Sequence, residues 1–255
     1  MTFGGHLDVL RKILIRILAV TLIFACLIFA FKDVTFSVLL SPSEPDFCTY
    51  RWLEDLIRTF KPEFSFGAFH IDLIATDLSS QFMTHITTSV YLGLFCSSPF
   101  ILYELFKFVS PALLDNEKKY SVQIVCIIYL LFIIGIFMSY FVLFPISFRF
   151  LGTYSVADKV HSAITLDSYI STFVTLTLMM GLVFQLPVVA YVLGRMGLVQ
   201  SSYLIKYRSY AFLAICVIAA IITPPDIMTL ILVAIPLYLL YEISIRVIRS
   251  VERKS

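Results

Sequence analysis

The sequence predicts an all-α integral membrane protein in which six transmembrane helices hold both chain termini on one side of the membrane. Three observations support this fold class: an apolar composition, apolar runs along the whole chain, and an uneven division of charge between the loops. Of the 255 residues, 60% are hydrophobic and 14% are charged, whereas a soluble domain has about 25% charged residues. A soluble fold could not hide so much apolar surface. Composition therefore argues against a soluble enzyme or a nucleic-acid binder.

Six apolar runs are long enough, or nearly so, to cross a membrane as helices. A transmembrane helix needs about 20 mostly apolar residues. The first run follows a basic segment and is not followed by a small-residue cleavage site, so we expect an uncleaved span and not a signal peptide. We expect Pro145 to end the third run and Pro187 to interrupt the fourth. The predicted spans are residues 13–31, 82–105, 124–144, 170–193, 210–222 and 227–245.

The loop charges orient these spans. Six spans place both termini on one side, and that side holds 13 of the 19 Lys and Arg residues but only 6 of the 17 Asp and Glu residues. Its formal charge is therefore +7, whereas the opposite side carries −5. Because cytoplasmic loops are enriched in Lys and Arg, the sequence predicts that both termini are cytoplasmic.

The last two predicted spans form a short hairpin. Only Thr223-Pro224-Pro225-Asp226 joins them, and consecutive prolines do not continue a helix. The fifth run has about 13 residues, or about 20 Å at 1.5 Å per residue, against a hydrocarbon thickness of about 30 Å. Two interpretations remain open: the bilayer thins locally around the hairpin, or tilt and additional helical residues make up the difference.

The long outer loop, residues 32–81, is predicted to hold an amphipathic helix. Apolar residues recur at helical spacing between Pro45 and Pro62, with charged residues on the opposite face. Such a helix could lie in the interface of the outer leaflet or cap the helix bundle, and we favour the cap because the loop is anchored at both ends. The whole chain, 1–255, is interpreted as a single membrane domain. The apolar face consists of Trp52, Leu53, Leu56, Ile57 and Phe60.

The sequence contains no recognisable catalytic constellation. It lacks HExxH, GxSxG, a phosphate-binding glycine loop and paired intramembrane aspartates. Its four histidines lie in different segments and its five cysteines form no CxxC, so we expect no metal site, no cofactor and no enzymatic activity. Gln185 is a polar side chain within a span, and its amide needs a partner from a neighbouring helix or from an incoming one.

Several carboxylates belong to the side that we expect to be cytoplasmic. Carboxylates near a basic face could receive guanidinium groups from a partner in bidentate fashion. Local pairing with the neighbouring basic residues Arg11, Lys118 and Lys119 is the simpler interpretation from the residues alone. The carboxylates are Asp8 before the first span and Glu104, Asp115 and Glu117 in or beside the second-to-third loop.

Six motifs, in order along nearly the whole chain, resemble those of the TatC family, the core membrane subunit of the twin-arginine protein translocase. The N-terminal motif is His6-Leu7-Asp8-Val9-Leu10-Arg11-Lys12, and the loop motif is Phe108-Val109-Ser110-Pro111-Ala112-Leu113 followed by Glu117. The others are Phe144-Pro145 with Phe148 and Phe150, Gly181 to Pro187 around Gln185, Arg208 with Tyr210, and Thr223 to Asp226 with Ile235-Pro236 and Tyr241-Glu242.

This resemblance implies a curved arrangement of six helices in the cytoplasmic membrane, with cytoplasmic termini and a short last hairpin. It also implies a function: binding signal peptides with consecutive arginines and moving folded proteins across the membrane by the proton-motive force. The implied partners are single-span subunits of the TatA and TatB type, the signal peptides of folded cargo, membrane lipid and further copies of the chain, with no nucleic acid. A small-solute secondary transporter is the alternative, although the spans offer few ionisable groups to couple ions.

Residue roles follow by position from the same resemblance. Glu117 and Phe108 match the carboxylate and the aromatic residue of the signal-peptide site, to which Pro111, Leu7, Asp8 and Arg11 also belong. The family glutamate of the N-terminal motif is replaced by Val9, and Asp8, one residue earlier, points about 100° away on a helix. Gln185 matches an intramembrane Glu or Gln and is expected to contact partner helices. The remaining motif residues, expected to be structural, are Pro145, Pro187, Pro224, Pro225, Asp226 and Glu242.

Overall fold

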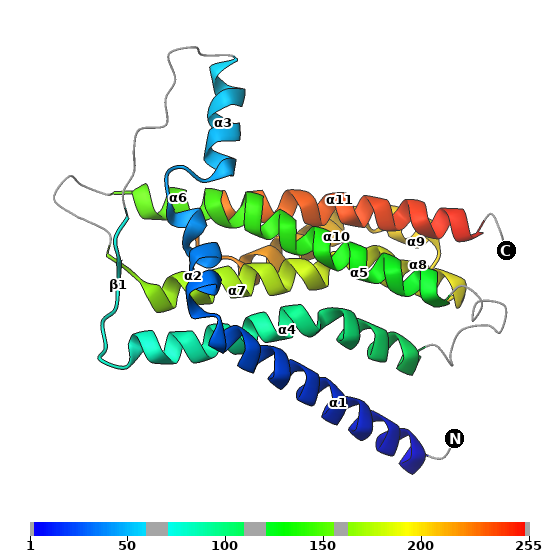
Figure 1. Ribbon diagram of the computed structural model, residues 1–255. Coiled ribbons are helices and arrows are strands. Elements are labelled where there is room, and N and C mark those ends of the chain that lie inside the picture. The colour runs from blue at the N-terminus through cyan, green and yellow to red at the C-terminus, as the bar shows by residue number, and fades with distance from the viewer. Residues whose placement is uncertain (1–2, 60–70, 110–120, 156–162, 253–255) are drawn as a thin grey trace.

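The computed structural model of the protein describes residues 3–59, 71–109, 121–155 and 163–252. Most of these residues are helical (Figure 1). Five described helical segments are long and apolar enough to cross a membrane, and α10 is a shorter apolar helix. The elements are α1 (Phe3–Ala30), α2 (Lys32–Leu40), η1 (Ser41–Ser43), α3 (Cys48–Arg58), β1 (Leu73–Ile74), α4 (Ser80–Val109), α5 (Ser121–Met138), η4 (Ser139–Leu143), α6 (Phe144–Thr153), β2 (Ile164–Thr165), α7 (Leu166–Val183), α8 (Leu186–Arg195), α9 (Ser201–Lys206), α10 (Arg208–Ile222) and α11 (Ile227–Glu252).

The all-α membrane fold predicted from the sequence is confirmed. Figure 1 shows the first turns of α1 and the last turns of α11 at the same end of the bundle, which we call the terminal end. The helices α2 and α3 and the strand β1 lie at the opposite end, the loop end. There β1 pairs in parallel with β2, with Leu73 opposite Ile164, so the long outer loop is tied to the segment that leads into α7.

The hydrophobic core forms where α7 packs against α5 and η4, and α11 adds Val233 to the same cluster. Aromatic rings fill its loop-end half: the Phe144 ring meets the rings of Tyr169 and Phe173 edge-on, with centroids 5.0 and 5.1 Å apart. Such edge-to-face pairs add to the free energy gained by burying the rings. The core therefore fixes η4 and α6 against α7 at the loop end.

Pro145 does not end the third span, contrary to expectation, because the helix continues as α6 to Thr153. A proline inside an α-helix has no N–H for the carbonyl four residues earlier, and its ring crowds that carbonyl. Here the five-residue π-helical segment η4 precedes Pro145 and changes the local geometry. The carbonyl of Phe141, four residues before the proline, accepts a hydrogen bond from the Thr49 hydroxyl of α3. A donor from another helix thus replaces the missing N–H.

The other helix boundaries largely follow the predicted spans, with three differences. The helix α1 begins well before residue 13, α11 continues to Glu252, and α2 follows α1 after a single residue. The added length of α11 is fixed at its end, since the Glu252 carboxylate accepts hydrogen bonds from the backbone N–H and the hydroxyl of Ser201, at 2.7 and 2.5 Å. The predicted interruption of the fourth span lies at Phe184 and Gln185, between α7 and α8.

The short last hairpin is present. The helix α10 has 15 residues, or about 22 Å at 1.5 Å per residue, so additional helical residues supply only a small part of the missing length. Asp226, in the connection that follows, accepts a hydrogen bond from the Thr229 N–H at 2.6 Å and so satisfies one free donor of α11. Local thinning of the bilayer around α10 stays a prediction.

The predicted amphipathic helix of the outer loop is α3, but it does not cap the bundle over most of its length. Only its first turn is buried, with Thr49 and Tyr50 7% and 2% exposed. Trp52 and Leu56 on its apolar face are 63% and 47% exposed. Figure 1 shows α3 projecting away from the spanning helices. The anchoring of the loop therefore holds one end of α3 and leaves the rest uncovered.

Replacing Tyr50 with phenylalanine is expected to destabilise the protein by about 1–3 kcal/mol, the cost of leaving buried carbonyl groups without a donor. The Tyr50 hydroxyl lies 2.8 and 2.9 Å from the carbonyl oxygens of Pro42 and Pro145 and shares its one proton between them. Burial raises the pKa of this hydroxyl, against the effect of the nearby Arg149 guanidinium, so it stays a donor at neutral pH. Thermal unfolding of the purified protein in detergent measures the change. The exposed Tyr154 provides the control, and equal unfolding temperatures for Tyr50→Phe and Tyr154→Phe would contradict the prediction.

Candidate functional site

The helices α1 and α4 pack closely at one crossing and separate toward the terminal end (Figure 1). A Cβ atom in place of the Gly93 hydrogen would lie 2.8 Å from the backbone nitrogen of Ala25, so glycine is needed for the close approach. One turn nearer the terminal end on each helix, the hydroxyls of Thr21 and Ser97 share a hydrogen bond of 2.9 Å. These contacts fix how α1 lies on α4 and where its N-terminal half runs.

An ion pair connects the two helices on the terminal side of this crossing. Nη1 of Arg16 on α1 lies 3.5 Å from Oε1 of Glu104 on α4. The Glu104 side chain is only 6% exposed, whereas that of Arg16 is 58% exposed. A buried carboxylate that loses its partner costs about 3–5 kcal/mol, so Arg16 compensates a charge that α4 could not otherwise bury. The α1–α4 pair therefore already holds one guanidinium group by charge.

Glu104 stands close to the predicted signal-peptide site. Phe108 follows it by four residues on α4, which places the two positions one turn apart on the same face, about 6 Å along the axis. On α1, Asp8 and Arg11 are exposed, as is Val9, at the position of the family glutamate. Leu7 and Phe108 belong to α1 and α4, but the structure does not describe their side chains. The predictions for Pro111 and Glu117 fall outside the described residues.

Gln185 lies at the break between α7 and α8, where its side chain bonds to backbone carbonyls. The regular helical hydrogen bonding stops here, and the Gln185 backbone N–H donates to Leu182 instead of Gly181. The Gln185 side-chain nitrogen lies 3.4 Å from the Gly181 oxygen and 3.1 Å from the Ile128 oxygen of α5. The amide thus supports the break and bridges α7 to α5, which is the internal role that the sequence left open.

Replacing Gln185 with leucine is expected to lower the free energy of unfolding by about 1 kcal/mol, the typical size of an interhelical hydrogen bond in membranes. The variant leaves the carbonyl of Ile128 without the side-chain donor. Thermal unfolding in detergent measures this effect. Gln185→Glu is a useful second variant to compare with Gln185→Leu, because a carboxylate cannot donate a hydrogen bond to a carbonyl unless it is protonated. A Gln185→Leu variant as stable as the parent protein would contradict the bridging role.

The remaining motif residues occupy structural positions in the second half of the chain. Glu242 of α11 pairs with Arg208 of α10 at 2.8 Å, and the Tyr238 hydroxyl donates to it at 3.3 Å. This pair ties the start of α10 to α11 across the hairpin. Pro187 is buried at the second position of α8, where its missing N–H costs no helical hydrogen bond. Pro224 and Pro225 lie between α10 and α11.

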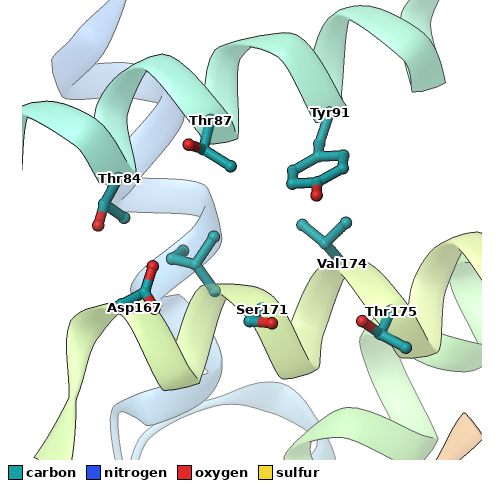
Figure 2. Close-up of a pocket in the computed structure, with 8 residues that line it drawn as sticks. Thr84, Thr87, Tyr91, Asp167, Ser171, Val174 and Thr175 are labelled. Carbon is teal, nitrogen blue, oxygen red and sulfur yellow. The ribbon is translucent and has the colours of Figure 1, made fainter.

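A second polar feature is a cavity of about 210 Å³ between α4 and α7 (Figure 2). Asp167, near the start of α7, places it toward the loop end, away from the Arg16–Glu104 pair. Hydroxyl groups both donate and accept hydrogen bonds, so the polar part of this cavity can hold water, while Ile170 and Val174 line the rest. Its polar lining comes from Thr84, Thr87 and Tyr91 of α4 and from Asp167, Ser171 and Thr175 of α7.

The sequence did not predict the partner of Glu104 or the hydroxyl-lined cavity. The spacing of Thr84, Thr87 and Tyr91 by three and four residues would have placed these polar groups on one face of a span. Nothing local pairs Arg16 with Glu104, because the contact depends on how α1 crosses α4. In the part of the chain that the structure describes, no group of three or more His, Cys, Asp or Glu side chains could hold a metal ion.

Comparisons with known proteins agree with one another. Residues 5–236 match the model of the family described as Sec-independent protein translocase protein (TatC). The chain is 34% identical over 258 residues to the Sec-independent protein translocase protein TatC of Blattabacterium sp. subsp. Periplaneta americana, covering 100% of this chain and 97% of that protein. It is 34% identical over 241 residues to the protein of the same name from Escherichia coli K12, covering 94% of this chain and 85% of that protein.

The fold has a counterpart among solved structures. A crystal structure of the twin arginine translocase receptor TatC is similar with a TM-score of 0.76 and 31% sequence identity. The match covers 97% of this chain and 99% of that chain. The similarity therefore extends over the whole bundle and includes the α1–α4 pair.

Proposed function

Because the chain belongs to the TatC family of Sec-independent protein translocase proteins, we propose that it is the receptor that binds twin-arginine signal peptides. As the core membrane subunit of the translocase, it takes part in moving folded proteins across the membrane, driven by the proton-motive force and without enzymatic activity of its own. The matched family is one of protein translocases, so the alternative of a small-solute transporter is not supported.

The observation that best supports this function is the pairing of Arg16 with the buried Glu104. This ion pair supports the proposal because a guanidinium group already lies beside a carboxylate between α1 and α4. Because the Glu104 side chain is only 6% exposed and the Arg16 side chain 58% exposed, a second guanidinium would reach this carboxylate by displacing Arg16 toward solvent. An arginine of a signal peptide would then bind Glu104 one turn from position 108 along α4.

The other site residues receive complementary roles in this proposal. Glu117 accepts one guanidinium in bidentate fashion, and Phe108 provides an aromatic face on which a guanidinium can stack. Pro111 shapes the loop, and Leu7, Asp8 and Arg11 line the approach on α1. Since Val9 replaces the family glutamate, Glu104 offers a second carboxylate for the second arginine of the signal.

The loop charges support an orientation of the chain in the membrane. The helix break at Gln185 and the short hairpin support a place where partner subunits bind. The terminal end, with a formal charge of +7, faces the cytoplasm. The protein lies in the inner membrane as a single six-span domain. Single-span subunits of the TatA and TatB type dock their helices near Gln185 and the short hairpin. Several copies of the chain assemble in the working complex, in contact with membrane lipid and without nucleic acid.

The experiment that tests this function is export of a folded reporter by cells in which this chain replaces their own TatC protein. A reporter with two consecutive arginines in its signal is expected to be exported. A matched reporter with two lysines keeps the charge but loses bidentate pairing, and its export should fall by at least about tenfold, equivalent to about 1.4 kcal/mol. Equal export of the two reporters would contradict the receptor function.

A further inference from the structure

The helix α3 leaves an apolar surface without a partner among the described residues. Trp52 and Leu56 are 63% and 47% exposed. The opposite face is charged and internally balanced: Arg58 pairs with Glu54 at 2.6 Å, and the Arg51 guanidinium pairs with a carboxylate just before the helix, at 3.1 Å. Large exposed apolar side chains beside a charged face mark an interaction surface.

The direction of α3 differs from that of the spanning helices. Figure 1 shows it running crosswise to α5, α7 and α11 and extending beyond the bundle at the loop end. A helix crosswise to membrane-spanning helices lies along the plane of the membrane. Since α3 extends past its neighbours in the bundle, its exposed part projects over the region beside the bundle, which a bilayer would fill.

The position at which α3 is attached along its spanning segment indicates its depth. The spanning segment runs from Val125 to Thr153. Phe141 and Pro145, which accept hydrogen bonds from α3, lie about 24 and about 30 Å along this segment from Val125. The hydrocarbon core is about 30 Å thick. The attachment lies just before Arg149, whose guanidinium is 5.3 Å from the Tyr50 ring. Because a charged side chain is costly in hydrocarbon, this part of the span belongs near the headgroups at the loop end.

The first turn of α3 also shows which face points into the membrane. On a helix, Thr49 lies within about 40° of both Leu53 and Leu56, so it belongs to the apolar face. Its hydroxyl donates to Phe141, which is nearer the terminal end than Pro145. The apolar face is thus directed back along the bundle, toward the hydrocarbon, and continues the exposed apolar surface of Phe137 and Phe141.

We propose that α3 is an in-plane membrane anchor, whose apolar face, with Trp52 at its edge, is inserted into the lipid interface at the loop end. Tryptophan is enriched at this depth because its ring is apolar and its N–H reaches polar groups. The occupant of the surface is the acyl-chain boundary of a phospholipid bilayer. Because the charges on the polar face are balanced, insertion requires no anionic lipid. The anchor holds the outer loop and the π-helical segment η4 at a constant depth.

The experiment uses Trp52 itself, which is the single tryptophan of the chain. The full-length protein is reconstituted in phosphatidylcholine nanodiscs whose acyl chains carry bromine either near the headgroup or near the chain end. Bromine near the headgroup is expected to quench most of the Trp52 fluorescence, and bromine near the chain end much less. Quenching by aqueous iodide without quenching by bromolipid would overturn the proposal, because the helix would then lie in water. Protection from both quenchers would overturn it too, since a protein would then cover the surface.

Two matched variants separate insertion from a general disturbance of the loop. Leu56→Gln places an amide on the apolar face, and Glu54→Gln places the same amide on the charged face, while both retain Trp52. Insertion predicts that Leu56→Gln shifts the Trp52 emission to longer wavelength and weakens quenching by shallow bromine, whereas Glu54→Gln leaves both unchanged. Equal effects of the two variants would contradict insertion of this face. These readouts do not involve signal peptides, so they are independent of the proposed receptor function.

Discussion

Glu117→Arg is expected to abolish export of a twin-arginine reporter while the protein remains in the membrane. In the proposed site Glu117 accepts a guanidinium of the signal peptide, and an arginine in its place repels that group. Losing one partner of a charge-assisted pair costs about 2–5 kcal/mol, or roughly 30-fold to several thousand-fold in affinity. Export is measured as the fraction of reporter outside the cytoplasmic membrane, and membrane fractions show how much of the variant is present.

Two further variants make this prediction specific to position 117. Glu117→Asp keeps the charge and should retain part of the export activity. Asp115→Arg introduces the same charge change two residues earlier and should have a much smaller effect, since the family motif assigns no role to that position. Normal export by Glu117→Arg, or equal loss in Asp115→Arg, would contradict the assignment of Glu117.

Gly135→Ala is expected to lower the free energy of unfolding by about 1–3 kcal/mol, the range for overpacking a tight core. The Cβ atom of an alanine at this position would lie 2.7 Å from the Met180 carbonyl oxygen and 3.0 Å from the Gly181 Cα atom. These are backbone atoms, so α5 and α7 must move apart to make room. The separation would also stretch the buried hydrogen bond between the hydroxyls of Ser139 and Thr177, which now measures 3.1 Å.

The matched control is Gly194→Ala, the same substitution at another helical glycine. There the new Cβ atom would lie 3.3 Å from Cγ1 of Ile248, and its nearest contacts are side-chain atoms and not backbone, so a smaller adjustment makes room. Thermal unfolding followed by size-exclusion chromatography in detergent measures both variants. Gly135→Ala should lose its monodisperse peak at a lower temperature than Gly194→Ala, and the opposite order would contradict the close packing of α5 on α7.

The spans could be predicted because the hydrophobic effect acts on local composition, and every apolar run became helix. The error at Pro145 has a tertiary cause. Proline ends a helix when nothing supplies the donor that it lacks, but Thr49, far away in the sequence, donates to the exposed carbonyl. A rule that considers only neighbouring residues cannot include such a donor.

The cap prediction for α3 was wrong for a different reason. An apolar helix face has the same sequence pattern whether protein or lipid covers it. Trp52 and Leu56 therefore predict that the face is covered, but not by what. The Arg16–Glu104 pair was missed because its two residues meet only through the crossing of α1 and α4. That crossing depends on the fit of Gly93 against Ala25, and the distribution of charges along the sequence does not reveal this fit.

The site assignments came from the resemblance of motifs and not from residue chemistry alone. Without it, Glu117 is one acidic residue among several beside basic neighbours, and local pairing would be the simpler interpretation. The same resemblance identifies Val9 as a position where the family carboxylate is missing. The structure then adds Glu104, a buried carboxylate with a guanidinium already beside it.

Photo-crosslinking of a twin-arginine signal peptide to the full-length protein in membranes tests the receptor function most directly. The peptide carries a photoreactive residue next to its arginine pair, and mass spectrometry of the digest locates the adducts. We expect adducts within residues 108–117 and on the first turns of α1, and we expect them to disappear in Glu117→Arg and with a twin-lysine peptide. Adducts confined to the loop end, or equal labelling by the arginine and lysine peptides, would contradict a guanidinium receptor at the terminal end.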